Sequence, residues 1–231
     1  MNTSDELNVA HKLYSNQDYP KTRSLWNLIT NAYRIIKSVY IFTHFDEYCR
    51  QLRSDKQEDK QEIYWNASYY EKLIDYIKII TAFETLNKAV LVKKGILIHK
   101  IEHSKLNKEL YKQQSAGKPV KISDFYLDGY PEITVRRNIT EFNGLAKSMA
   151  TINFSHTLNE EYQSVLNLDK KLVYYLKEIN LKRNRLHLYT DFHGAFSVEH
   201  HIEKWRFIKE TSISVIKKEK DKINEELKDC I

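Results

Sequence analysis

The stretch ASYYEKLIDYIKIITAFETLNKAVLVKKG, residues 67–95, decides the fold of this chain. Apolar side chains recur in it at three- and four-residue steps, which is the period of an amphipathic helix. Gly95 stands directly after the last apolar turn, where helices commonly end. The stretch therefore predicts a long helix over residues 67–94. Its broad apolar face carries Leu73, Ile77, Ile80, Phe83 and Val90.

Three further stretches show the same helical period. A continuous apolar stripe predicts one helix over residues 24–52, and the charged run of residues 53–61 is expected to connect it to the helix that follows. Thr157 and Glu160 match a capping box, and the apolar repeat behind them predicts another long helix. A last helix is expected over residues 198–227.

Glycine and proline are scarce in this sequence. Five Gly and three Pro in 231 residues are fewer than sheet-rich folds usually place in their turns. The sequence therefore predicts an all-α fold, in which long antiparallel helices form an elongated bundle. A single domain is expected over residues 1–231, with its core over about residues 24–228.

The segment 113–153 is expected to form a loop or a small insert in this bundle. Residues 113–132 hold two of the five glycines and two of the three prolines, which favours irregular structure. Within the rest of the insert, residues 133–137, ITVRR, fit a strand, and residues 139–149, ITEFNGLAKSM, fit a short helix. A further helix is expected to begin within residues 96–112.

Charge and cysteine content limit the classes of protein. The net charge of +6 permits nucleic-acid binding but does not establish it, because acidic residues are interleaved with the lysines. The two cysteines, Cys49 and Cys230, stand far apart, as expected for free thiols in a reducing cytosol. No signal peptide is recognisable at the N-terminus, and charged residues interrupt the most apolar window, residues 74–92. We therefore expect a cytoplasmic protein without membrane contact.

A cluster of basic residues and a histidine stands in LKRNRLHLYTD, residues 181–191. The apolar repeat that runs through Leu176 and Ile179 brings Arg183 to the same inward side of the helix. His187 follows four residues after Arg183, so the two side chains are neighbours on one helical face. A cation in a core position is costly unless it is paired or lies at an interface or a cleft.

Two interpretations of this cluster are open. A histidine titrates near neutral pH and can take a proton from a ribose 2′-OH, while an arginine fork can hold the phosphate, so the pair suits phosphodiester cleavage without a metal. Alternatively, the basic residues only complement the dipole at the C-terminal end of a structural helix.

The stretch RNRLH, residues 183–187, resembles the signature of the HEPN superfamily of small helical domains. That signature is an Arg, commonly followed by Asn, Asp or His, and then a His after four to six intervening residues. The stretch FETLNKAVLVKKG, residues 83–95, resembles the earlier long helix of the same family, and the two stretches stand in the family's order. The resemblance would cover residues 24–228.

The resemblance implies a metal-independent endoribonuclease without cofactors, which cleaves RNA at a homodimer interface. It further implies a role in anti-phage defence or in a toxin–antitoxin setting, with an antitoxin or another protein as a partner. His187 would be the acid and base, Arg183 the phosphate clamp and Asn184 a positioning group. The residues expected to bind RNA are Lys182, Arg185 and Tyr189.

The spacing of the motif leaves an alternative open. Three residues separate Arg183 from His187, one fewer than in the family signature. Pairing Lys182 with His187 gives four intervening residues, and pairing Arg185 with His193 gives seven. Some members of the family are catalytically silent, so the second hypothesis is a module that binds RNA or a protein without cleaving it.

A zinc hydrolase is the third hypothesis. HKIEH, residues 99–103, matches a zinc-protease pattern in which His99 and His103 are ligands on one helical face and Glu102 is the general base. Glu178 stands at the distance expected for a third ligand. Patterns this short also arise by chance in chains that are rich in Lys, Glu and His.

Overall fold

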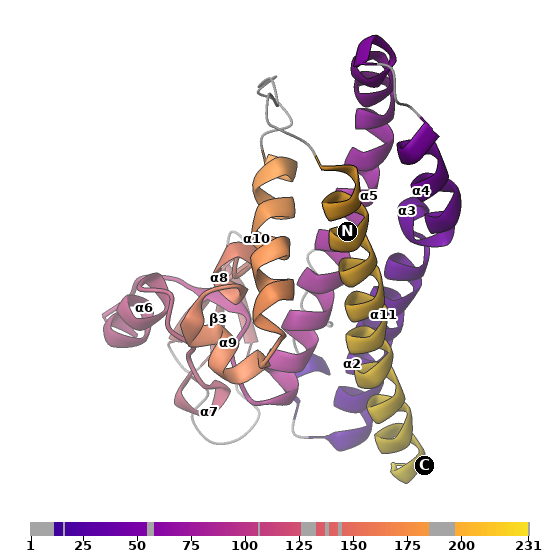
Figure 1. Cartoon of the computed structure of the whole chain (residues 1–231). Helices are drawn as coiled ribbons and strands as arrows, with labels where there is room; N and C mark the ends of the chain where they lie inside the picture. The colour runs from indigo at the N-terminus through magenta and orange to yellow at the C-terminus, as the bar shows by residue number, and fades with distance from the viewer. Residues whose placement is uncertain are drawn as a thin grey trace. The chain divides into compact units, whose positions relative to one another are not determined.

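In the computed structural model, the described residues are 12–15, 17–54, 58–105, 107–125, 133–136, 139–142, 145–184 and 197–230. Helices make up most of these residues, which confirms the predicted all-α class (Figure 1). The long helices are α2 (Asp18–Lys37), α5 (Glu58–Lys93), α10 (Lys170–Asn184) and α11 (Val198–Asp229). The shorter helices are α3 (Tyr40–Thr43), α4 (Phe45–Ser54), α6 (Lys108–Ser115), α7 (Ile122–Phe125), α8 (Phe154–Thr157) and α9 (Glu160–Leu166).

The chain divides into two compact units. The first unit contains Met1–Ile29, Glu84–Leu168 and Asp221–Ile231, and the second contains Thr30–Phe83 and Asp169–Lys220. Helices α2, α5 and α11 each contribute residues to both units. The single domain expected over residues 1–231 stays a prediction.

Aromatic side chains join the helices of the second unit around Trp205. This side chain of α11 is 2% exposed. Its ring stacks on that of Tyr76 from α5, with an interplanar angle of 2°, and it meets Phe42 of α3 edge to face. A further edge-to-face pair, Tyr175 with Phe207, joins α10 to α11. Aromatic pairs of this kind typically contribute about 0.5–1.5 kcal/mol each beyond the area they bury.

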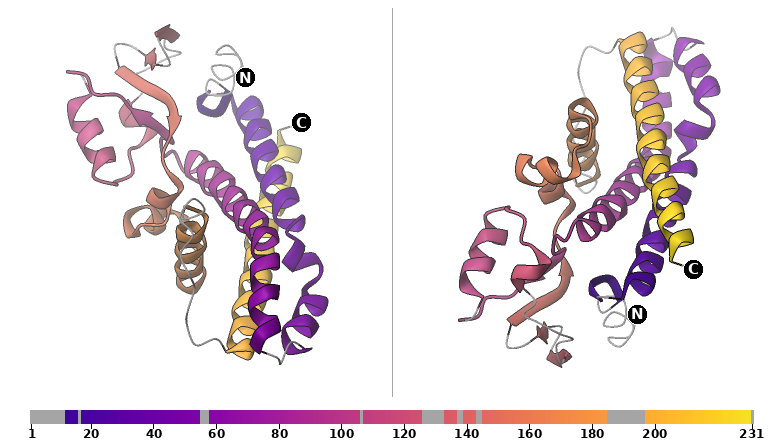
Figure 2. Two further views of the ribbon diagram at one scale, coloured as in Figure 1. Left: turned by 90° about the horizontal axis from the view of Figure 1, so that it is seen from above. Right: turned by 90° about the horizontal axis from the view of Figure 1, so that it is seen from below.

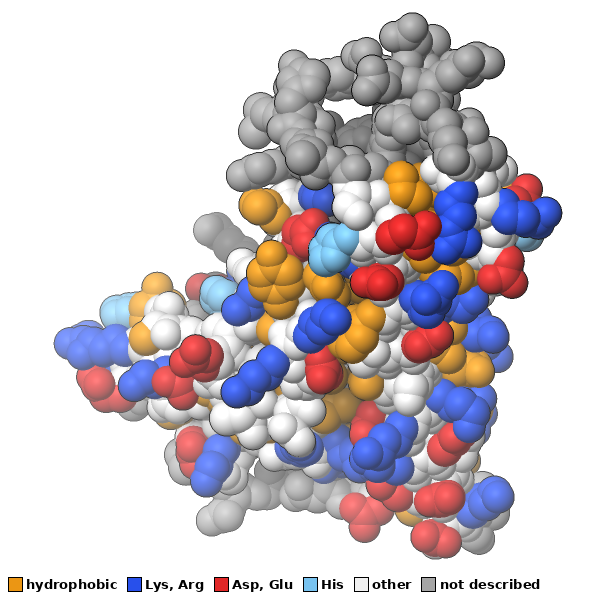
Figure 3. Space-filling view, in the orientation of Figure 1, with side chains coloured by type: hydrophobic (Ala, Val, Ile, Leu, Met, Phe, Trp, Pro, Cys, Tyr) orange, Lys and Arg blue, Asp and Glu red, His pale blue; other side chains and the backbone are white. Residues whose placement is uncertain are grey.

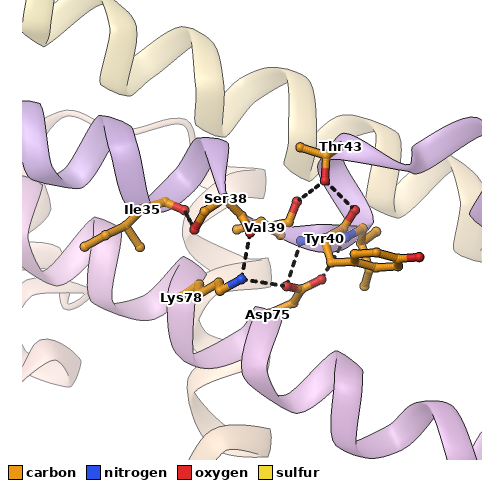
Figure 4. Close-up of polar contacts among 8 residues, drawn as sticks. Ile35, Ser38, Val39, Tyr40, Thr43, Asp75 and Lys78 are labelled. Atoms are coloured by element: carbon orange, nitrogen blue, oxygen red, sulfur yellow. Dashed lines mark hydrogen bonds and ion pairs between the residues drawn. The ribbon is translucent and has the colours of Figure 1, made fainter.

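The single helix expected over residues 24–52 is not continuous, so this prediction was wrong. The chain forms α2, α3 and α4 there, and it leaves the helix at Ser38 and Val39. Asp75 of α5, which is 1% exposed, occupies this break (Figure 4). Its two carboxylate oxygens accept hydrogen bonds from the backbone N–H groups of Tyr40 at 2.8 Å and Ile41 at 2.7 Å. The first N–H groups of a helix lack partners within the helix, so the carboxylate stabilises the start of α3.

The predicted helix over residues 67–94 is confirmed as α5, which begins earlier, at Glu58, and ends at Lys93. Gly95 adopts a φ of 75°, which is the left-handed conformation of a helix C-terminus. Ile80 and Phe83 are fully buried as expected, but Ile77 is 41% exposed. The prediction that Ile77 belongs to the apolar face was therefore wrong.

The long helix expected behind the capping box is also interrupted. Asn159, rather than Thr157, caps α9, because its side chain accepts a hydrogen bond from the backbone N–H of Tyr162. The helix ends at Leu166, and the capping residue Asn167 that follows has a left-handed φ of 55°. A second start follows, at which Asp169 accepts a hydrogen bond from the N–H of Leu172 at 2.9 Å and so caps α10.

The first unit contains a four-stranded antiparallel sheet in the order β1-β4-β3-β2 (Figure 2). Its strands are β1 (His99–Ile101), β2 (Ile133–Arg136), β3 (Ile139–Phe142) and β4 (Leu145–Thr151). The strand expected at residues 133–137 is thus confirmed. The short helix expected at 139–149 was wrong, since residues 139–142 form β3 and residues 145–149 belong to β4. The helix expected to begin within residues 96–112 is confirmed as α6, which begins at Lys108, after β1. Short apolar runs fit either a strand or a helix, and pairing with neighbouring strands decides between them.

Helix α6 is fixed to this sheet by one side chain. Gln114 is 6% exposed, and its amide accepts a hydrogen bond from the N–H of Ile101 and donates one to the carbonyl of His99, both at 2.8 Å.

No helix of the described part of the chain is long and apolar enough to cross a membrane.

Candidate functional site

The candidate site lies at the C-terminal end of α10. The inward positions before it, Leu172, Leu176 and Ile179, are buried, as their spacing predicted. Lys182 and Arg183 form the last turn and are half-buried. Asn184 ends the helix and is exposed. Arg185, His187, Tyr189 and His193 lie outside the described residues.

The guanidinium of Arg183 is held by its neighbour. Its Nε and Nη2 donate to Oδ1 of Asn184 at 3.3 and 3.2 Å. Among the described residues, Arg183 has no carboxylate partner. A guanidinium has five N–H groups, so this arrangement leaves about three of them for an anion.

The neighbouring cations, Lys182 and Lys204, are both paired with the single carboxylate of Glu178. Nζ of Lys182 lies 3.0 Å from one carboxylate oxygen of Glu178, one turn earlier on α10. Nζ of Lys204, on α11, lies 2.6 Å from each of its two oxygens. The ammonium of Lys204 also lies 5.1 Å from the centre of the Tyr175 ring. The cluster thus ties α10 to α11 just before the turn that carries Arg183.

Burial and charge oppose each other in this cluster. Burial by itself raises the pKa of the Glu178 carboxyl, but the hydrogen bonds and charges of Lys204 and Lys182 outweigh it and hold this pKa below its ordinary value. Burial lowers the pKa of Lys204, and Glu178 offsets only part of that effect. Three short contacts between nitrogen and oxygen indicate an ionised cluster at neutral pH.

Positive and negative side chains are interspersed over the face drawn in Figure 3. This distribution matches the interleaving of acids and lysines in the sequence. On this face no broad basic surface stands out.

The helix on which the zinc hypothesis depends is not formed. His99 lies in β1, where it is 6% exposed and its Nδ1 lies 2.7 Å from the hydroxyl of Tyr14. His103 follows the strand and is exposed, and its ring meets Tyr111 edge to face. The described residues contain no group of three or more His, Cys, Asp or Glu side chains that could hold a metal ion.

Glu84 and Lys88, in the second stretch that resembles the HEPN family, form an ion pair at 2.6 Å. Lys88 also donates to the hydroxyl of Thr151 on β4 at 2.7 Å. The two side chains stand four residues apart, so this is an ion pair within one helix.

Sequence reasoning missed two residues near Arg183. Lys204 stands 26 residues from Glu178, so only the packing of α10 against α11 brings them together. Asn180 was recognisable in principle, because it is a polar residue in an inward position of α10, directly after Ile179.

Comparison with known proteins finds no family model, no curated protein and no solved structure that matches the chain.

Proposed function

We propose that the protein is a metal-independent endoribonuclease of the HEPN type. The observation that supports this best is the half-buried guanidinium of Arg183, which lies beside Asn184 and has no carboxylate partner among the described residues. A cation in this state has N–H groups to offer to a phosphate. The neighbouring Lys182, in contrast, is already paired with Glu178.

In this proposal His187 removes the proton from a ribose 2′-OH. The 2′ oxygen then attacks the adjacent phosphorus, and the bond from phosphorus to the 5′ oxygen breaks. A protonated histidine, from the same chain or from a second copy, returns a proton to the leaving oxygen. Arg183 binds the phosphate and stabilises the charge that develops on it, and Asn184 orients the guanidinium. Lys182, Arg185 and Tyr189 bind neighbouring parts of the RNA.

The same proposal gives the protein a setting. Two copies form a homodimer, and each contributes one Arg183 and one His187. The enzyme acts in the cytoplasm, in anti-phage defence or as the toxin of a toxin–antitoxin pair, and a protein partner restrains it. It needs no cofactor, since histidine and arginine supply the chemistry.

The test is cleavage of a structured RNA by the purified protein in the presence of EDTA. We expect the wild type to cut the RNA, and His187→Ala and Arg183→Ala to lose at least 100-fold in rate, about the contribution of a single acid–base or anion-stabilising group. Arg50→Ala, which removes an exposed cation on α4, is the matched control and should cleave normally. Equal rates for the wild type and His187→Ala would exclude this function.

A second candidate is a silent HEPN-like module that binds RNA or a protein. The short interval between Arg183 and His187 favours it, because only three residues separate them. RNA binding that Arg183→Ala weakens, without cleavage by the wild type, would select this candidate over the nuclease.

A further inference from the structure

A buried polar side chain lies on α10 three residues before Arg183. Asn180 of α10 is 8% exposed, and its side-chain oxygen Oδ1 finds no hydrogen-bond partner among the described residues. The preceding residue, Ile179, belongs to the core. Buried polar atoms are almost always paired, so an unpaired one near a candidate site calls for an explanation.

The helix places Asn180 on the same face as Arg183 and Asn184. Side chains three or four positions apart on a helix are neighbours, about 5–6 Å apart at Cβ. Arg183 lies between two amide oxygens along this face. It now donates to the exposed oxygen of Asn184, while the buried oxygen of Asn180 is unused.

We propose that Asn180 is a positioning residue for Arg183 in the RNA-bound state. When a phosphate binds, the guanidinium turns one N–H group to Oδ1 of Asn180 and holds its remaining groups on the phosphate. This inference rests on the proposed recognition of RNA by Arg183.

The free-energy cost of leaving the buried oxygen of Asn180 without a hydrogen bond favours this change. An unpaired acceptor in a poorly solvated place destabilises the free protein, and the cost disappears when a charged donor reaches it. In this proposal the hydrogen bond to Asn180, which is absent from the structure, is made when RNA binds, and an interaction gained only on binding strengthens binding.

Ser212 supplies a matched control in the same unit. It is fully buried on α11, and its hydroxyl likewise has no partner in the described part of the chain. It stands 14 residues after Val198, the first residue of α11, a distance of roughly 20 Å along the helix. A change there alters a buried polar group without touching α10 near Arg183.

The experiment is a double-mutant cycle on RNA binding. Dissociation constants are measured with a 2′-O-methyl RNA, which cannot be cleaved, for the wild type, Asn180→Leu, Arg183→Ala and the double variant. We expect Asn180→Leu to weaken binding about 10- to 100-fold, the worth of one hydrogen bond from a charged donor, and to have no further effect once Arg183 is alanine. Its melting temperature should not fall, because leucine removes an unpaired buried amide.

Asn180→Ala repeats the test with a smaller side chain, and Ser212→Ala should leave the dissociation constant unchanged. Wild-type affinity in both Asn180 variants, or an equal loss with and without Arg183, would overturn the inference while the proposed function stands. A wild type that neither binds nor cleaves RNA would overturn the proposed function and this inference with it.

Discussion

Nζ of Lys204 lies 2.6 Å from each of the two carboxylate oxygens of Glu178. The side chain of Lys204 is only 15% exposed, and that of Glu178 is 30% exposed. This contact joins α10 to α11 within two turns of Arg183. It connects the last turns of α10 to the neighbouring helix.

Removal of this contact should destabilise the second unit. We expect Lys204→Met to lower the free energy of unfolding by about 1–2 kcal/mol, because Glu178 would remain half-buried with fewer donors. Lys182→Met removes a contact within one helix and should cost only about 0.5 kcal/mol. Urea titration monitored by circular dichroism measures both, and equal losses would contradict the different roles of the two lysines.

The same carboxylate should make stability depend on pH. The pKa of Glu178 in the folded protein lies below its ordinary value, so its contribution is fully present above the pKa of the unfolded chain, about 4.3. The contribution is lost as the pH falls through the folded pKa. The gap in unfolding free energy between the wild type and Glu178→Gln should therefore narrow between about pH 5 and pH 3. A gap that stays constant over this range would count against the ionised cluster.

Asp75 should be a sensitive position in the second unit. Asp75→Ala leaves the N–H groups of Tyr40 and Ile41 without their carboxylate partner, and we expect a loss of about 2–3 kcal/mol. Asp75→Asn keeps one acceptor oxygen and should lose less. Faster hydrogen exchange at Tyr40 and Ile41 would locate the effect. In Asp46→Asn, which alters an exposed residue of α4, their exchange should stay normal.

Tyr14 should matter for the first unit. Its hydroxyl lies 2.7 Å from Nδ1 of His99 and accepts a hydrogen bond from the N–H of Ile98, and burial raises its pKa. Tyr14→Phe removes the hydroxyl and leaves these two groups without it, so we expect a loss of about 1–3 kcal/mol in thermal or urea unfolding. Tyr111→Phe, on the half-exposed side of α6, is the control and should change little.

Much of the helical architecture was readable from periodicity alone. The buried stripes of α2, α5 and α11 follow the predicted spacing, and α11 ends within two residues of its expected limit. The breaks between α2 and α3 and between α9 and α10 could not be predicted from periodicity. Each has a cause that the apolar pattern does not contain. Asp75 acts on residues 35 positions earlier in the chain, and Asn167 adopts a left-handed conformation that its sequence permits but does not require.

The inward phase of α10 agrees with the half-buried state of Arg183. The roles of Arg183 and Asn184 in a catalytic site stay predictions. The contact between Glu178 and Lys204 required the packing of two helices, which a spacing rule within one helix does not give. The roles of Arg185, His187 and Tyr189 stay predictions, since these residues lie outside the described ranges.

The break between α2 and α3 depends on a residue from another part of the chain. Residues 24–52 taken alone have the pattern of one unbroken helix, and the acid that stabilises the break stands on α5. The direction of the chain after Ser38 therefore depends on a side chain that is made later in synthesis. A nascent chain that ends before Asp75 lacks the carboxylate that binds the N–H groups of Tyr40 and Ile41, so the break gains this contact only after that part of α5 has been made.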